Sequence, residues 1–228
     1  MCSDQIIDAP PLPDLALCRR LSAAGTPREL LASAVPDLMA IPARLDALGF
    51  RPVATARRFT AVIDHLTRCL LSLRAEELGG APGSYAWLAA GSQGRGEQTP
   101  HTDQDTALIH ADGLPPGASD WFRQLAVRVG DDLAACGIPT CAGGVSAANA
   151  DWQGDVSTWR ERILSSLTRT DPVSVRRTAH YFDLRTIAGP PELLEPIRGQ
   201  AVRLARSRER YSQMNAGKIL SDTPPPLR

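Results

Sequence analysis

Two short apolar runs separated by a glycine-rich turn constrain the fold of this chain most strongly. The run "SYAWLAA" from Ser84 is bounded by glycines, which is typical of a buried strand. The turn "GSQGRGEQ" follows, and "DQDTALIHAD" from Asp103 then predicts a second strand. This strand arrives too soon for a crossover helix, and the glycine order G-x-x-G-x-G is not that of a dinucleotide-binding fingerprint. A Walker phosphate loop is also excluded, because the only lysine, Lys218, is far from the turn.

Predicted helices and strands alternate along the rest of the chain. "DWFRQLAVRVGDDLAACG" predicts a helix capped by Ser119 or Asp120, and "DVSTWRERILSSLTRT" predicts another. "CAGGVSAAN" is interpreted as a third strand, "TAHYFDLRTIAG" as a fourth, and residues 192–213 as a final helix. This alternation predicts an α/β (α+β) sheet domain over residues 81–215.

A helical region is expected before this domain, over residues 15–80. "TPRELLASAVPDLMAIPARLDALG" begins with a Thr-Pro-x-Glu helix start and ends with glycine. The next segment carries one apolar stripe at helical spacing and stops at Gly79-Gly80. The stripe consists of Phe59, Val62, Ile63, Leu66, Leu70 and Leu73. Residues 1–14, with three prolines, are expected to be a flexible leader, and residues 216–228 a proline-rich tail or linker.

Composition narrows the class of protein. Of the 228 residues, 43% are apolar and 22% are charged, and the formal net charge is zero. No overall field would therefore attract nucleic acid or an anionic membrane, and neither is expected as a partner. The five cysteines contain no C-x-x-C pair, and the N-terminus lacks the features of a signal peptide. We expect a soluble, cytoplasmic protein with reduced thiols.

The glycine-rich turn and the following aspartates suggest phosphate chemistry. Asp103 and Asp105 are two residues apart, so in an extended strand their side chains point to the same face. Paired carboxylates there are suited to Mg²⁺ or Mn²⁺, which prefer hard oxygen ligands. Backbone N–H groups of the turn can approach a phosphate closely, and Ser92 and Arg95 add donors. Together these features indicate phosphoryl or nucleotidyl transfer.

These residues carry a family resemblance. G-S followed ten residues later by D-x-D resembles the signature of the polymerase-β-type nucleotidyltransferase superfamily. The fuller string "GSQGRGEQTPHTDQD" resembles the nucleotidyltransferase domain that is often joined to cyclic-nucleotide-binding and CBS domains in bacteria. That family is similar to protein-PII uridylyltransferase and glutamine synthetase adenylyltransferase. The resemblance extends through "YFDLRTIAG", and "DTPPPL" resembles the junction to a C-terminal helical domain.

The resemblance implies a polymerase-β-like nucleotidyltransferase sheet with flanking helices. It implies transfer of a nucleoside monophosphate from an NTP to a hydroxyl acceptor, a protein or a small molecule, in signal transduction and with Mg²⁺ or Mn²⁺. A third carboxylate on a later strand is assigned to Asp183, which would orient or deprotonate the attacking hydroxyl. The implied catalytic and metal-binding residues are Asp103, Asp105 and Asp183, and the implied nucleotide-binding residues are Gly91, Ser92, Gly94, Arg95, Glu97 and Arg185.

Several alternatives remain open at this stage. The chain departs from the family pattern at Thr106 and in "VSAANA", so a catalytically silent nucleotide-binding regulatory module is the alternative function. Arg95 could pair with Glu97 instead of contacting phosphate, and Asp183 could be a structural partner of an arginine. His101 is expected at the rim of the site. His180 is expected to face the core.

Overall fold

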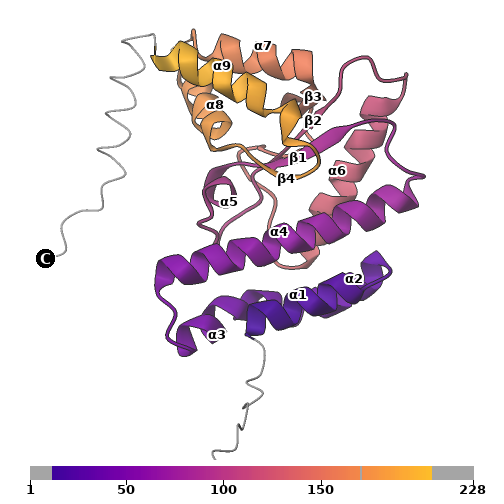
Figure 1. Ribbon diagram of the computed structural model, residues 1–228, viewed down its shortest axis with the longest axis vertical. Helices are drawn as coiled ribbons and strands as arrows, with labels where there is room; N and C mark the ends of the chain where they lie inside the picture. Colours follow the sequence, from indigo (N-terminus) through magenta and orange to yellow (C-terminus); the bar gives the residue numbers. More distant parts are fainter. Residues whose placement is uncertain (1–11, 170, 207–228) are drawn as a thin grey trace, which may run out of the picture.

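A four-stranded mixed sheet lies between two layers of helices in the computed structural model, which describes residues 12–169 and 171–206 (Figure 1). The strands are β1 (Tyr85–Ala89), β2 (Thr106–His110), β3 (Gln153–Asp155) and β4 (Arg185–Ala188), in the order β3-β2-β1-β4. β1 is antiparallel to both β2 and β4, whereas β2 and β3 are parallel. The predicted mixed α/β fold with flanking helices and an N-terminal helical region is confirmed.

The first helical layer is built by the N-terminal part of the chain and α6. It comprises α1 (Pro13–Ala23), α2 (Pro27–Ala34), the 3-10 turn η1 (Leu38–Ala40), α3 (Ile41–Ala47), α4 (Pro52–Glu77) and α6 (Ala118–Ala135). The predicted apolar stripe of α4 is buried from Phe59 to Leu70, and it joins Trp87 of β1 and Leu108 of β2 in one core cluster. Figure 1 shows α4 between the sheet and α1–α3. Burial of this stripe therefore attaches the helical region to the sheet.

The helical region is more broken than the sequence pattern predicts. α2 starts as expected, since Thr26 Oγ1 accepts a hydrogen bond from the N–H of Glu29 (3.2 Å). The helix then ends at Ala34, just before Pro36. Proline has no N–H to continue the helical ladder, so the chain passes through η1 and restarts at α3.

The second helical layer covers the opposite face of the sheet. It comprises α7 (Val156–Ser166), α8 (Pro172–Asp183) and α9 (Glu195–Arg206), with the 3-10 turns η2 (Ala150–Trp152) and η3 (Pro191–Leu193) beside it. Ala86 and Leu88 of β1 and Ile109 of β2 point into this layer and pack with Trp159. The indole N–H of Trp159 donates to the carbonyl of Leu108 (2.9 Å), which fixes α7 on the sheet.

The predicted third strand is wrong. "CAGGVSAAN" forms turns, with Gly144 in the left-handed region (φ 76°) and its N–H bonded to the carbonyl of Cys141 (3.1 Å). Only Thr140, just before this segment, forms an isolated bridge with Gln104. The strand that pairs with β2 is β3, whose short polar sequence "QGD" lacks the apolar alternation of a strand.

The predicted fourth strand is half correct. Residues from Thr178 to Asp183 are the end of α8, and β4 begins only at Arg185. α8 starts at a strong signal, because Asp171 caps it by accepting from the N–H of Ser174 (3.0 Å) and Pro172 follows the cap. The strand position expected for Asp183 is therefore incorrect, and so is the core-facing position expected for His180.

Element ends differ from expectation in smaller ways. α6 begins at Ala118 after Gly117, so neither Ser119 nor Asp120 is its cap residue. α9 starts at Glu195, and the predicted continuation of this helix to residue 213 lies outside the described residues. The tail and most of the leader also lie outside them.

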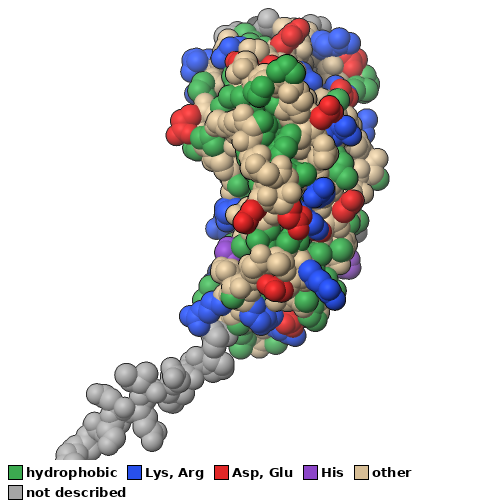
Figure 2. Space-filling view, turned by 90° about the vertical axis from the view of Figure 1, so that its right-hand side faces the viewer, with side chains coloured by type: hydrophobic (Ala, Val, Ile, Leu, Met, Phe, Trp, Pro, Cys, Tyr) green, Lys and Arg blue, Asp and Glu red, His purple; other side chains and the backbone are tan. Residues whose placement is uncertain are grey.

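No helix in the described ranges combines the length and apolar character needed to cross a bilayer. Acidic and basic side chains are interspersed on the face drawn in Figure 2.

Candidate functional site

A single helical turn, α5 (Gly91–Arg95), follows β1 and forms one wall of the site. Gly91 has a φ of 53°, and a Cβ atom there would lie 2.1 Å from Oδ2 of Asp105. A Cβ at Gly94 would lie 2.2 Å from the carbonyl oxygen of Asp183. Gly94 is therefore required by its approach to the backbone, whereas Gly91 is favoured by its left-handed φ and by the nearby carboxylate of Asp105, which explains the spacing of this motif.

The Asp-x-Asp motif is held in an extended segment directly before β2. Asp105 is fixed by its carbonyl, which accepts from the N–H of Ala90 (2.8 Å). Between the two aspartates, the buried amide of Gln104 donates to the carbonyls of Gly130 (3.1 Å) and Ile138 (2.6 Å). Since Gln104 points inward, Asp103 and Asp105 project together on the other side of the segment, as predicted.

Cys141 joins the two aspartates. Ligand atoms of Asp103, Asp105 and Cys141 all lie within 4.8 Å of one another, and they form the one such group of His, Cys, Asp and Glu found among the described residues. Burial raises the pKa of Asp105, the nearby charge of Asp103 raises it further, and a hydrogen bond from the Cys141 thiol opposes the rise. Burial together with Asp105 raises the pKa of the Cys141 thiol to about 11. At neutral pH the protonated thiol therefore donates to Asp105.

This donor set suits a hard divalent cation. Burial and the charge of Asp103 both disfavour the charged form of Asp105, and a bound cation would relieve that repulsion. Mg²⁺ and Mn²⁺ prefer carboxylate oxygens, whereas a thiol serves softer metals and only as a thiolate. Asp103 and Asp105 therefore fit Mg²⁺ or Mn²⁺, with Cys141 as a hydrogen-bond donor to one of them.

A buried polar network fixes the back of the α5 turn. Arg185 at the start of β4 donates to both carboxylate oxygens of Asp64 in α4 (2.7 and 3.2 Å). The same guanidinium donates to the carbonyls of Gln93 (2.9 Å) and Gly94 (3.2 Å). The side-chain amide of Gln93 also donates to Asp64 (3.1 Å). In this structure Arg185 is thus bound to an aspartate, behind the turn.

The exposed side of the α5 turn carries an ion-pair network. Arg95 donates to Glu97 (2.9 Å) and to Asp183 (2.7 Å). Asp183 is therefore beside the turn, although it is not part of the group formed by Asp103, Asp105 and Cys141 in the described part of the chain. Ser92 is partly exposed at the beginning of the turn. The pairing of Arg95 with Glu97 is the alternative that the sequence left open.

A cavity of about 390 Å³ opens beside the two aspartates, within the size range of small-molecule sites. Its lining includes Asp103, Asp105 and Cys141, and it also includes Arg176, Arg177 and His180 from α8. Residues 91–96 do not line it. The carboxylates of the Asp-x-Asp motif therefore stand between the glycine turn on one side and this cavity on the other.

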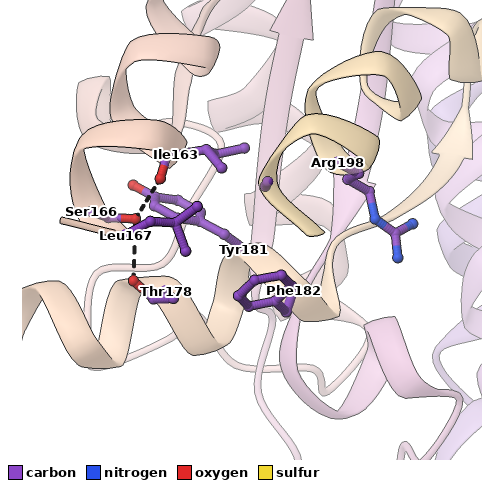
Figure 3. A pocket seen from close by; sticks show the side chains of 8 residues that line it. Ile163, Ser166, Leu167, Thr178, Tyr181, Phe182 and Arg198 are labelled. Atoms are coloured by element: carbon purple, nitrogen blue, oxygen red, sulfur yellow. Dashed lines mark hydrogen bonds between the residues drawn. The ribbon is translucent and has the colours of Figure 1, made fainter. Parts of the chain in front are cut away.

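A second, enclosed pocket is a packing feature. It measures about 10 Å³ and lies where α7, α8 and α9 meet, beside Tyr181 and Phe182 (Figure 3). Figure 3 shows the hydroxyl of Ser166 between the Ile163 carbonyl and the Thr178 hydroxyl, to which it is bonded at 2.8 and 3.1 Å. A space of about one water molecule cannot hold a nucleotide.

Several residues at the site were missed by the sequence prediction. Asp64 gave a weak signal, because Thr60, Asp64 and Thr67 follow one polar line beside the apolar stripe of α4, and all three are buried. Gln93 and Cys141 gave no signal apart from their place in or near the motifs. His180 was assigned to a core because its segment was interpreted as a strand.

Comparison with known proteins identifies the family of this chain. No curated protein matches the chain. The model of a family described as "Putative nucleotidyltransferase DUF294" matches residues 37–173, which is more than half of the chain. The matched residues contain the α5 turn, Asp103, Asp105 and Cys141. The chain belongs to this nucleotidyltransferase family.

Proposed function

We propose that this protein is a metal-dependent enzyme that transfers a nucleoside monophosphate from an NTP to a hydroxyl acceptor and releases pyrophosphate. The observation that carries the proposal is the contact between Gly91 of the glycine turn and Asp105 Oδ2, with Asp103 beside Asp105. A phosphate chain bound by the turn would lie directly beside the two carboxylates.

The aspartates, the glycine turn and the two arginines would have different roles in this reaction. Asp103 and Asp105 would hold one or two divalent cations, Mg²⁺ or Mn²⁺, and when bound these neutralise phosphate charge and activate the attacking oxygen. Backbone N–H groups at Gly91 and Ser92, and the Ser92 hydroxyl, would bind the triphosphate. The N–H of Gly94 donates to the Ala90 carbonyl (2.8 Å), so Gly94 would serve by allowing the close approach of the chain at Asp183. Glu97 and Asp183 hold the guanidinium of Arg95 beside the turn, from which it would contact a phosphate oxygen. Arg185 would act behind the turn, by fixing its carbonyls.

The second substrate has space on the other side of the aspartates. The cavity of about 390 Å³ reaches Asp103 and Asp105 without contacting residues 91–96, so an NTP bound to the turn would leave it free for the acceptor. The family supports an NTP substrate.

The experiment is a transfer assay with α-labelled NTPs and Mg²⁺ or Mn²⁺. Wild type is compared with Asp103→Asn, Asp105→Asn and Asp131→Asn, the last being the same substitution at an exposed position in α6. Loss of either site carboxylate should reduce transfer at least about 100-fold, because metal-assisted charge stabilisation contributes several kcal/mol. Asp131→Asn should retain activity. Equal activity in all four proteins would reject the proposal.

One observation favours a second candidate, a catalytically silent nucleotide-binding regulatory module. Asp183 and Arg185 were assigned to the site from the sequence that follows the Asp-x-Asp motif. Both are paired within the protein, Asp183 with Arg95 and Arg185 with Asp64. Such a module would bind NTP with metal and release no pyrophosphate with any acceptor. Calorimetric NTP binding without turnover would therefore favour the module, and turnover would exclude it.

A further inference from the structure

The cavity beside the aspartates contains an imidazole that the proposed roles do not use. His180 lies in the last turn of α8 and lines this cavity together with Asp103 and Asp105. Its ring packs edge-to-face on Trp152, with centroids 5.8 Å apart. The side chain is partly buried and belongs to the lining of the cavity.

A hydrogen bond determines which ring nitrogen of His180 can accept a proton. Nδ1 lies 2.9 Å from the backbone carbonyl of Arg176. A carbonyl oxygen can only accept, so Nδ1 carries the hydrogen of this bond. In the neutral ring Nε2 then has a free lone pair, and no residue in the described ranges is hydrogen-bonded to Nε2. The bond to Arg176 and the contact with Trp152 also restrict the ring orientation.

The other groups that face the cavity are less suited to accept a proton. Asp103 and Asp105 are assigned to the cation, and the Cys141 thiol, whose pKa is raised to about 11, is protonated at neutral pH. Asp151 is paired with Arg177 at 2.5 Å, and Arg176 is a cation. Asp183, the carboxylate predicted for this task, is bound to Arg95 and does not line the cavity.

We infer that His180 is the general base that deprotonates the acceptor hydroxyl in the cavity. This inference rests on the proposed nucleotidyl transfer. His180 Nε2 takes the proton of the acceptor O–H, and the oxygen forms a bond to the α-phosphorus of the NTP. The bond between the α-phosphorus and the bridging oxygen breaks, and pyrophosphate leaves with the electron pair. The imidazolium then releases its proton to water, and the acceptor keeps the nucleoside monophosphate.

The test compares two substitutions of His180 in the full chain with a matched histidine. His180→Asn keeps an amide that can donate to the Arg176 carbonyl but has no basic nitrogen, and His180→Ala opens space for free imidazole. His101→Asn is the control, because His101 is exposed and does not line the cavity. The assay measures labelled NMP and NMP-glycerol formed from NTP, with water and glycerol as hydroxyl probes, over a range of pH.

General base catalysis predicts a specific set of results. His180→Asn should lower kcat by about 100-fold or more, while metal-dependent NTP binding measured by calorimetry stays within about twofold of wild type. The decrease of kcat at acidic pH should disappear in this variant, and free imidazole should restore part of the activity of His180→Ala. His101→Asn should behave as wild type. A purely structural role of His180 would give neither the changed pH profile nor the rescue.

Two outcomes overturn the inference in different ways. If wild type turns over and His180→Asn retains its kcat and pH profile, the base is another group and the proposed function stands. If the decrease of kcat at acidic pH disappears in Asp151→Asn, that carboxylate is the base instead. If wild type forms no product from any NTP with either probe, the proposed function fails and the role of His180 fails with it.

Discussion

Arg185 and Asp64 are paired through both carboxylate oxygens, at 2.7 and 3.2 Å, although they are 121 positions apart in the chain. Asp64 belongs to the N-terminal helical region, and Arg185 starts the edge strand β4. Because Arg185 also binds the carbonyls of Gln93 and Gly94, the helical region is connected to the glycine turn through one side chain. The geometry of the proposed phosphate site therefore depends on residues outside it.

Asp64→Asn should test this connection. The substitution leaves a partly buried guanidinium without its counter-charge, and we expect a loss of about 1–3 kcal/mol in the free energy of unfolding, measured in urea. The KM for NTP should also rise, because the carbonyls of the turn lose a fixed partner. Asp131→Asn, an exposed position, should change stability by less than about 0.5 kcal/mol. An Asp64→Asn protein with wild-type stability and KM would contradict the proposed coupling.

Gly91→Ala and Gly96→Ala form a matched pair. Both glycines have positive φ, 53° and 77°, so alanine should cost each about 1–2 kcal/mol in backbone strain. Only at Gly91 would the new Cβ collide with Asp105, since no atom lies within 4 Å of the Cβ position at Gly96. Metal-dependent NTP binding, measured by calorimetry, should be lost in Gly91→Ala and kept in Gly96→Ala. Equal binding by the two variants would show that the contact with Asp105 is unimportant.

Asp105→Asn should increase stability at neutral pH in metal-free buffer. The folded protein raises the pKa of Asp105 above its ordinary 3.8, so the folded state binds this proton more tightly than the unfolded state does. The free energy of unfolding therefore falls as pH rises from 3.8 through the raised pKa, and asparagine avoids that loss. Urea unfolding should show the gain at neutral pH and a smaller one near pH 4, and added Mg²⁺ should stabilise wild type only. A less stable Asp105→Asn protein at neutral pH would contradict the predicted gain in the free energy of unfolding.

Cys141 should react slowly with iodoacetamide despite its partial exposure. A pKa of about 11 leaves roughly 0.1% thiolate at pH 8, against about a quarter for a free cysteine. Mass spectrometry at pH 8 should therefore show alkylation at least about 100-fold slower than that of free cysteine. Asp105→Asn should accelerate it, because the neighbouring carboxylate contributes to the raised pKa. Modification at the rate of free cysteine would show that the thiol is not held by Asp105.

Asp183→Asn and Glu97→Gln should separate the two roles open to Asp183. Both carboxylates bind Arg95, so a role limited to holding that arginine would give similar, modest losses in NTP binding. A metal ligand would instead lose transfer by about 100-fold or more on Asp183→Asn alone. The structure favours the first result, and transfer kinetics with matched Mn²⁺ titrations would measure it. A selective loss with Asp183→Asn would restore the role that the family resemblance implies.

Local sequence signals predicted those parts of the fold that local interactions determine. The stripe of α4, the apolar run of β1 and the glycine spacing of α5 are each visible within a short window, and each was found. The error at Thr178–Asp183 arose because apolar and aromatic residues there resemble a strand, whereas the Asp-Pro helix start at Asp171 determines the conformation. The strand predicted for "CAGGVSAAN" was wrong for a similar reason, since two adjacent glycines favour a turn over a strand.

The candidate site was predictable where its residues lie in one motif. Asp103 and Asp105 were found from their spacing, and the resemblance supplied their partners in the turn. Asp64, Cys141 and His180 come from separate elements, and their convergence depends on the order and direction of the strands. A single sequence contains no signal for such long-range packing, so these residues became visible only in the fold.

The connection from Asp64 to Arg185 has a practical consequence for protein fragments. A fragment that starts at residue 81, where the predicted sheet domain begins, would lack α4, so the core around Trp87 and Leu108 would lose one of its walls and Arg185 would lose its carboxylate. A fragment that ends with the family match at residue 173 would remove β4 and leave a long edge of β1 unpaired. Truncated versions of this protein should therefore keep both α4 and β4 to be expressed in folded form.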